Sequence, residues 1–211
     1  MNITKYGHCC LLIETDGVKI LTDPGVYSTG QNTLMGIDAI LLTHDHSDHL
    51  DIDSIKTILH NNSKAIVYTN KEVEKKLEAQ NIAYKILLDG QKAEIRGVSI
   101  EGVGLLHTLM HSAIPQSENT GYVIAEKLLY PGDSFVKPKR PIEILALPVA
   151  GPWLKLSEAI DYAVALKPKV CFPVHDGILK KVGSTNVIPQ KVLTPLGITF
   201  VVLEEEKVQE F

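Results

Sequence analysis

Residues 43–49, Thr-His-Asp-His-Ser-Asp-His, place three imidazoles and two carboxylates within seven positions. The largely apolar residues 37–42 come immediately before this motif and predict a buried strand that delivers the histidines to a loop at its end. Few roles other than binding divalent metal need so many ligand groups so close together. Alternation along the loop sends His44 and His46 the same way, with Asp48 and His49 near a second point. The spacing therefore predicts two adjacent metal ions rather than one.

Three further candidate ligands follow other predicted strands. His107 comes after residues 98–106, Asp133 after residues 128–132, and His175 after residues 170–174. Loops beyond strand ends are where a rigid sheet presents functional groups. Three imidazoles and a shared carboxylate suit one ion, and two imidazoles, Asp48 and the same shared carboxylate suit the other. Both ions would keep a position for water, as catalytic sites require. The predicted ligands are His44, His46, Asp48, His49, His107, Asp133 and His175.

The predicted ligand set contains nitrogen and oxygen donors and no cysteine. Such donors suit Zn²⁺ best and also permit iron, manganese or nickel. Taken singly, Asp133 could be an ordinary turn aspartate and His175 a buried, hydrogen-bonded imidazole. Their positions after predicted strands, together with the histidine motif, favour the metal-binding interpretation.

Groups of short strands with interspersed amphipathic helices predict an α+β sandwich, with sheets in the middle and helices outside. Asp16 and Gly17 indicate a hairpin between two early strands. Other strands are expected at residues 64–69, 98–106, 121–130, 142–149, 170–174 and 198–203. Helices are expected after Asp51 or Asp53, after Asn70 and after Ser157, because these side chains can cap a helix. A last helix is expected around residues 187–194.

The chain of 211 residues is expected to form one domain over residues 1–211. Its net charge of −4 provides no overall attraction to nucleic acid or to an anionic membrane, so nucleic acid is an unfavoured partner. No apolar run is long enough to cross a bilayer, and the first residues lack the core of a signal peptide. Three cysteines, a sparse and odd number, favour a reducing compartment. We therefore expect a cytoplasmic protein.

Several other residues have a structural interpretation first. Beside an apolar strand, His8 is expected to pack, with a place at the rim of the site as the alternative. The cysteines, including Cys9, are expected to be small core residues. Trp153, in a loop after Gly151 and Pro152, is expected to pack but could wall the pocket. The basic residues just after Asp133 form a solvated turn or, alternatively, an anion pocket: Lys137, Lys139 and Arg140.

Four motifs together resemble the metallo-β-lactamase fold superfamily over nearly the whole chain. They are His-Asp-His-Ser-Asp-His at residues 44–49, Leu-Thr-Asp-Pro-Gly at 21–25, Pro-Gly-Asp-Ser at 131–134 and Pro-Val-His-Asp-Gly at 173–177. Within the superfamily, the chain is most similar to small single-domain metal-dependent hydrolases of the ascorbate-phosphate lactonase type. The resemblance implies a four-layer αββα sandwich with the site at one edge.

The resemblance also implies individual roles. His44, His46 and a third histidine would bind the first metal. Asp48, His49 and His175 would bind the second, and Asp133 would bridge the two ions. Asp23 would orient a metal-binding histidine through a hydrogen bond. His107 and His111 are both candidates for the third histidine. We favour His107 because it follows the predicted strand directly; His111 would then support a ligand or face the substrate.

The leading functional hypothesis is a dinuclear hydrolase, with zinc first, acting on a small ester-like molecule. Two cations lower the pKa of a bound water from about 16 toward about 7, which provides hydroxide at neutral pH. A lactone or a phosphodiester is the first choice of substrate. Asp48 would bind metal and also orient the nucleophile or accept its proton.

Two hypotheses of other classes stay open at this point. One is a metal-binding sensor or interaction module without turnover. The other is an iron-dependent redox protein on the same fold. The sequence leaves the substrate, the physiological metal and the oligomeric state open.

Overall fold

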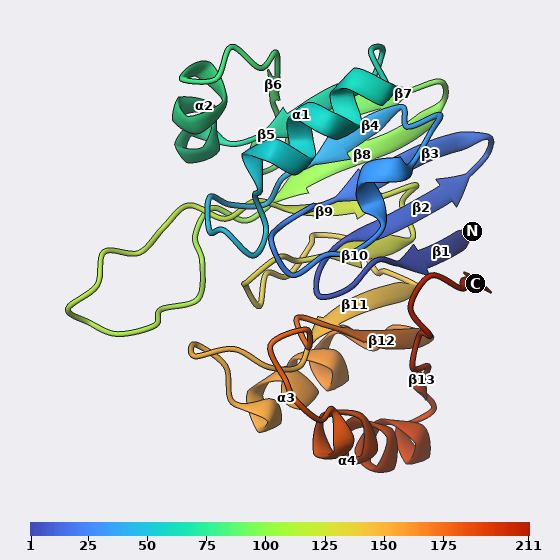
Figure 1. Cartoon of the computed structure of the whole chain (residues 1–211). Helices are drawn as coiled ribbons and strands as arrows, with labels where there is room; N and C mark the ends of the chain where they lie inside the picture. Colours follow the sequence, from blue (N-terminus) through green and yellow to red (C-terminus); the bar gives the residue numbers. More distant parts are fainter.

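The computed structural model describes all 211 residues and arranges them in four layers, helix, sheet, sheet and helix (Figure 1). Helices α1 (Ile52–Asn61) and α2 (Lys71–Glu78) cover the outer face of one sheet. Helices α3 (Leu156–Leu166) and α4 (Gly183–Leu193) cover the outer face of the other. The predicted αββα sandwich is confirmed. None of the helices has the length and apolar character needed to cross a bilayer.

Each sheet has seven strands. The first has the order β14-β1-β2-β3-β4-β5-β6 and consists of β1 (Asn2–Lys5), β2 (Leu11–Thr15), β3 (Val18–Thr22), β4 (Ala39–Leu41), β5 (Ile66–Thr69), β6 (Lys85–Ile86) and β14 (Val208–Glu210). The second has the order β13-β12-β11-β10-β9-β8-β7 and consists of β7 (Lys92–Ile95), β8 (Val98–Val103), β9 (Gly121–Ile124), β10 (Leu128–Tyr130), β11 (Ile144–Pro148), β12 (Val170–Val174) and β13 (Thr199–Phe200).

Both sheets change from antiparallel to parallel pairing along the chain. Strands β3 to β6 run parallel to one another in the first sheet, and β10 to β13 do so in the second. The carboxyl ends of parallel strands meet at one edge of a sheet, where functional loops gather. The loops after β3, β4, β10, β11 and β12 carry Asp23, the histidine motif, Asp133, Trp153 and His175.

The core consists of three apolar layers. Between the sheets, the buried side chains include Ile13, Tyr122, Tyr130 and Phe172. The second layer lies between the first sheet and helices α1 and α2, and the third lies between the second sheet and helices α3 and α4. Because both faces of the inner strands are covered, the strands read as continuous apolar runs rather than alternating ones. This packing makes the sheet edge a rigid platform for the loops.

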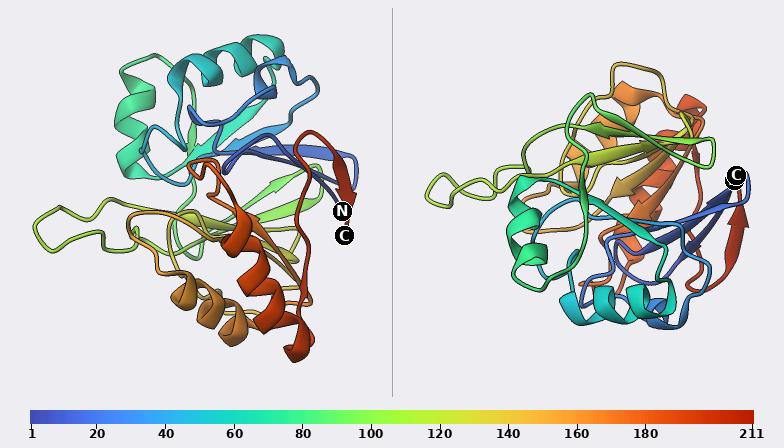
Figure 2. Two further views of the ribbon diagram at one scale, coloured as in Figure 1. Left: turned by 60° about the horizontal axis from the view of Figure 1, so that its bottom comes forward. Right: turned by 90° about the horizontal axis from the view of Figure 1, so that it is seen from above.

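A long loop between β8 and β9, residues 104–120, projects away from the body of the protein (Figures 1 and 2). Its base is closed by a bridge between Leu106 and Glu118 and by the bond from the His107 N–H to the Ser117 carbonyl at 2.9 Å. The strand expected to run to Leu106 ends at Val103 instead. His107 therefore lies at the base of the projecting loop and does not terminate the strand, which corrects the prediction.

The chain ends lie side by side (Figure 1). Strand β14 pairs with β1, and the Met1 ammonium donates to the Phe211 carbonyl at 3.0 Å. Neither strand is predicted from the sequence; β14 in particular is exposed along its length and has no apolar pattern. The strand predicted at residues 198–203 pairs only at β13, because the chain then leaves this sheet to reach the other.

Helix starts were predicted with mixed success. Asp51 caps α1, accepting from the Ser54 N–H at 3.3 Å and the Ser54 hydroxyl at 2.7 Å, and Asn70 caps α2. The prediction that Ser157 caps α3 is wrong. The cap position is Lys155, whose side chain makes no capping bond, and Ser157 lies inside the first turn. The helix begins earlier because Leu156 already packs against the second sheet.

We expect Asp51→Ala to lower the free energy of unfolding by about 1 kcal/mol, because the Ser54 N–H at the start of α1 loses its acceptor. Asp53→Ala is the matched control: Asp53 lies in the first turn without capping and contributes about 0.5 kcal/mol or less through the helix dipole. Urea denaturation of both variants measures the difference. Equal losses for the two variants would contradict the assignment of the cap.

Candidate metal centre

Side chains from both sheets converge at the edge formed by the parallel strands. One group of potential ligands consists of His44, His46, His107 and Asp133, whose ligand atoms all lie within 4.8 Å of one another. The His44 Nε2 and His46 Nδ1 atoms are 3.0 Å apart, so the alternation along the loop does bring these rings together. The His107 Nε2 atom lies 3.3 Å from Asp133 Oδ2. Three imidazoles and one carboxylate thus face a common point.

A second set of side chains lies on the other side of Asp133. The His175 Nε2 atom is 2.9 Å from Asp133 Oδ2, and the His49 Nε2 atom is 3.1 Å from Asp133 Oδ1. Asp48 Oδ2 is 3.5 Å from His175 Nε2 and 3.8 Å from His49 Nε2. The structure therefore brings together all seven residues that the sequence analysis singled out as ligands, with Asp133 in contact with both sets.

The protonation states required by the hydrogen bonds leave lone pairs directed at the centre. Nδ1 of His44 donates to the Thr43 hydroxyl at 3.0 Å, and Nδ1 of His107 donates to the Thr108 carbonyl at 2.5 Å. Nδ1 of His49 donates to Asp23 Oδ2 at 2.7 Å. In its neutral form, each of these rings carries its proton on Nδ1, which leaves Nε2 as the acceptor that faces the centre.

Several of the atoms that face the centre are buried without any hydrogen-bond partner. They are Nε2 of His49, His107 and His175 and Oδ1 of Asp133. Buried polar atoms without partners are costly and need an explanation. Lone pairs from imidazole and carboxylate groups gathered at one point are the donor set that divalent cations require. The residues present therefore fit a metal centre.

Asp23 holds the centre from behind. Its carboxylate is fully buried and accepts from the Thr43 N–H at 2.8 Å, the Thr43 hydroxyl at 2.6 Å and the Tyr130 hydroxyl at 2.8 Å, in addition to His49. The turn after Asp23 comes very close to the motif, because a Cβ on Gly25 would lie 1.9 Å from the Asp48 carbonyl oxygen. Asp23 therefore fixes the orientation of His49, in the position that the family resemblance implied.

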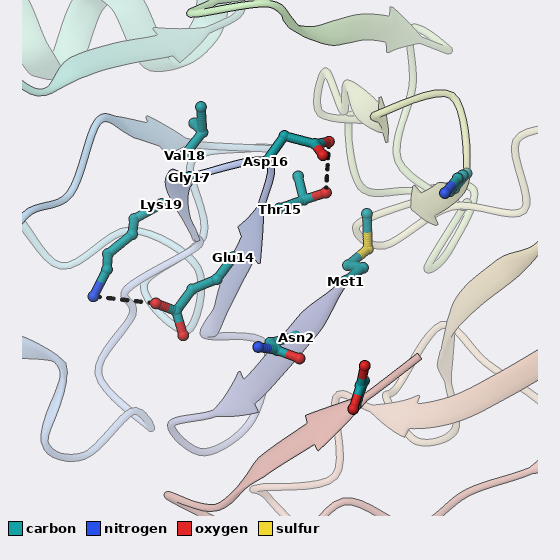
Figure 3. Close-up of a pocket in the computed structure, with 10 residues that line it drawn as sticks. Met1, Asn2, Glu14, Thr15, Asp16, Gly17, Val18 and Lys19 are labelled. Carbon is teal, nitrogen blue, oxygen red and sulfur yellow. Dashed lines mark hydrogen bonds and ion pairs between the residues drawn. The ribbon is translucent and has the colours of Figure 1, made fainter.

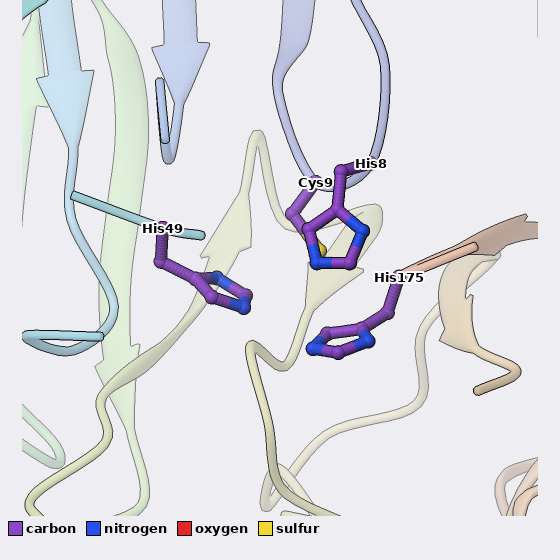
Figure 4. Close-up of side chains that lie close together, drawn as sticks. All are labelled: His8, Cys9, His49 and His175. Atoms are coloured by element: carbon purple, nitrogen blue, oxygen red, sulfur yellow. The ribbon is translucent and has the colours of Figure 1, made fainter. Parts of the chain in front are cut away.

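His8 lies beside the site, as in the alternative to simple packing that the sequence left open. Its Nδ1 accepts from the Gly177 N–H at 3.1 Å, so its Nε2 donates to Asp48 Oδ2 at 3.2 Å. Its ring lies 4.2 Å from that of His175, centroid to centroid. Figure 4 shows His8 beside His49 and His175, with the thiol of Cys9 close to them. Ligand atoms of these four residues also lie within 4.8 Å of one another.

Three residues of the site have backbone conformations that L-residues rarely adopt. The φ angles are 39° at His8, 34° at Asp23 and 62° at His175. Such conformations cost on the order of 1 kcal/mol or more each and persist only where the surroundings over-determine them. The contacts around the site therefore hold these three residues in place.

Electrostatic effects within the cluster are large. Burial would raise the pKa of Asp133, but the imidazoles of His49, His107 and His175 outweigh it and hold that pKa well below its usual value. Burial and the charge of His49 lower the pKa of His44 well below its usual value. Burial also opposes the charge on Asp48, but the bond from His8 and the charge of His49 lower its pKa to about 2. These groups are thus an anionic carboxylate pair and a neutral imidazole, as metal ligation requires.

The centre meets solvent on one side only. His44, His49, His107, Asp133 and His175 are buried. His46 is half-buried, and the Asp48 side chain is 21% exposed. A substrate would therefore approach from the side of His46 and Asp48.

His107 and His111 have different environments. His107 is 2% exposed and faces Asp133, whereas His111 is exposed in the projecting loop, where its Nδ1 accepts from the Ala113 N–H at 3.1 Å. The geometry thus favours His107 as the third histidine.

Supporting residues escaped the sequence analysis because no local pattern marks them. The Tyr130 hydroxyl contacts Asp23, and the Asn119 side chain accepts from the Asp133 N–H at 3.0 Å. Trp153 does more than pack, since its indole N–H donates to Asp133 Oδ2 at 2.8 Å. For His8, the sequence did contain a signal, because this histidine comes just before an apolar strand. The start of that strand, β2, lies at the same edge of the sheet as the end of its antiparallel neighbour β3.

Two alternative features do not contribute to the centre. Arg140 pairs with Glu101 at 3.3 Å and with Glu126 at 2.6 Å, so it does not form an anion pocket beside Asp133. A polar hollow of about 410 Å³ lies at the turn between β2 and β3, where Glu14 pairs with Lys19 at 3.1 Å (Figure 3). It contains no histidine, and it lies at the start of β3, the opposite end from Asp23.

Comparison with known proteins gives consistent matches. Residues 2–175 match the model of the beta-lactamase superfamily domain. Protein Rv0786c of Mycobacterium tuberculosis is 34% identical over 85% of both chains. A UPF0173 metal-dependent hydrolase of Lysinibacillus sphaericus is 26% identical over 83% of this chain and 85% of its own. A crystal structure of a protein assigned as a metal-dependent hydrolase, from Parabacteroides distasonis, is similar with a TM-score of 0.79 and 27% identity, covering 97% of this chain and 93% of that one.

We expect His107→Ala to lower the metal content by about one ion per chain, because the first group loses one of its three imidazoles. His111→Ala is the matched control and should keep the wild-type content. Elemental analysis of the purified variants measures both. Loss of metal from the His111 variant alone would reverse the assignment.

We expect Asp23→Asn to weaken metal binding by roughly 10–100-fold, because an amide cannot accept from all four donors that surround this carboxylate. Competition with a chromogenic chelator measures the change. Asp16→Asn makes the same substitution in an exposed turn and should leave the affinity unchanged. An unaltered affinity in the Asp23 variant would show that His49 needs no such support.

Proposed function

The chain belongs to the metallo-β-lactamase fold superfamily, and from this premise we propose that it is a metal-dependent hydrolase with two divalent ions, zinc first. The observation that carries the proposal is the convergence of unpartnered, buried imidazole nitrogens on a carboxylate at the edge of the sandwich. Relatives described as metal-dependent hydrolases support the same activity.

Two ions are proposed because Asp133 contacts imidazoles on both of its sides. His44, His46 and His107 would hold one ion with Asp133. His49, His175 and Asp48 would hold the other with the same carboxylate. Zinc is the first choice because imidazole nitrogens predominate among the ligands.

Bound ions of this kind would act as a Lewis acid toward the electrophile. They would also lower the pKa of bound water, so that hydroxide is available near neutral pH. The residues of the chain supply the rest. Asp48 is partly exposed and directs Oδ2 toward His49 and His175, so it can orient the nucleophile and accept its proton. The N–H of His8 holds this carboxylate in place. The buried walls of the site keep bulk water from the other ligands.

A small ester-like molecule is the proposed substrate, with a lactone or a phosphodiester first. A carbonyl or phosphoryl centre is the electrophile that such a site activates. The one open side, at His46 and Asp48, lets a small molecule reach the centre.

A reducing compartment, and hence a cytoplasmic location, forms a further part of the proposal. Cys9, Cys10 and Cys171 are all buried and unpaired. Buried free thiols in a secreted protein would be unusual, whereas they are ordinary in the cytosol.

The test is turnover on a panel of lactones and phosphodiesters. Removal of metal with a chelator should abolish hydrolysis, and addition of zinc should restore it. His46→Ala and Asp133→Ala should lower kcat/KM by roughly 100-fold or more, because loss of the ions removes the stabilisation of charge that develops in the transition state. His60→Ala, at the exposed end of α1, is the matched control and should keep full activity.

Two results would contradict the proposal. A fully metal-loaded protein without turnover across the panel would indicate a binding or sensing role. Iron as the bound metal, together with oxygen-dependent turnover, would indicate redox chemistry.

A further inference from the structure

We propose that Trp153 is a positioning residue that fixes the rotation of the Asp133 carboxylate between the two groups of ligands, an inference that rests on the metal centre of the proposed function. The indole N–H donates to Asp133 Oδ2 at 2.8 Å, and both groups are buried. An indole N–H can only donate, so the contact does not depend on a tautomer.

Other residues hold the backbone of Asp133 but not its carboxylate. The Asp133 N–H donates to the Asn119 side chain at 3.0 Å, and its carbonyl accepts from the Thr108 N–H at 2.8 Å. The carboxylate itself faces imidazoles and the indole, and Oδ1 has no hydrogen-bond partner. Apart from the imidazoles of the centre, the indole is thus the one group that determines which way this carboxylate turns.

Gly151 makes the indole contact sterically feasible. Its φ is 144°, and a Cβ at this position would lie 2.8 Å from the indole nitrogen and 3.2 Å from two ring carbons. The indole therefore lies directly against bare backbone. Any side chain at residue 151 would push the N–H away from Asp133.

The ring of Trp153 also spans both groups of ligands. It meets His107 edge-on at 5.5 Å and His175 edge-on at 5.8 Å, while Phe135 packs against it at 5.7 Å. Trp153 is 6% exposed. A single rigid side chain from the loop after β11 therefore connects the loops after β8, β10 and β12. A carboxylate shared by two ions must present its oxygens in one orientation, and supporting hydrogen bonds of this kind tune metal affinity.

The chain contains no other tryptophan, so indole fluorescence comes from this ring and its surroundings alone. Titration of zinc into chelator-treated wild type should change the emission in step with metal binding. In Gly151→Ala the tryptophan remains, but its N–H is displaced, so the response to zinc should shrink or vanish.

Affinity provides the second readout. Trp153→Phe keeps an aromatic ring without a donor, and replacement of Trp153 by benzothienylalanine keeps the shape and removes only the N–H. Both should bind zinc roughly 10–100-fold more weakly than wild type. The cobalt-substituted forms should show an altered visible spectrum, which a purely structural role would not produce. Phe211→Leu removes an aromatic ring at the chain end, where the ring packs on Phe172 rather than on Trp153, and is the matched control with wild-type affinity.

The possible outcomes separate this inference from the proposed function. Wild-type zinc affinity and cobalt spectrum in the benzothienylalanine protein would overturn the positioning role while leaving the hydrolase proposal intact. Weakened binding in that protein, with no hydrolysis by wild type, would support the positioning role and contradict the hydrolase. A wild type that binds no divalent ion would overturn both.

Discussion

The Asp133 carboxylate is the point on which both halves of the site depend. It lies between imidazoles carried by the first sheet, such as His49, and imidazoles carried by the second sheet, such as His175. A buried carboxylate surrounded by imidazoles is stable only when charges balance, because the low dielectric of the interior penalises each uncompensated group. Divalent cations bound by these lone pairs would provide that balance. The two sheets are therefore joined by the contacts at Asp133 as well as by the packing of their apolar faces.

The apolar sandwich makes this cluster sustainable. Rigid strands deliver each loop to the edge, and the strained backbone at His8, Asp23 and His175 is held by bonds to neighbouring loops. The same network connects the first strands of the chain with the last ones. Asp23 fixes His49 from the first sheet, while Trp153 fixes Asp133 from the second. Each side of the centre thus has its own buried support, which is the arrangement expected where metal affinity must be tuned.

Local chemistry explains which parts could be predicted. The histidine motif after a buried strand, and the strand ends before Asp133 and His175, depend on patterns a few residues long. Caps such as Asp51 are of the same kind. Ser157 led to a wrong prediction because a serine before a helix can cap it. In the structure, Leu156 packs against the second sheet and α3 begins before the serine. Strand β14 has no pattern at all, since it pairs at an exposed edge.

From the sequence by itself followed the ligand types, their order along the chain, the α+β sandwich and the resemblance to a metallo-hydrolase superfamily. Those properties reside in residue chemistry and short-range periodicity. Only the tertiary structure decided that His107 rather than His111 turns toward Asp133, that His8 holds Asp48, and that a tryptophan reaches the shared carboxylate over Gly151. These contacts join residues distant in the chain, and their existence depends on how two sheets pack, which no local pattern encodes.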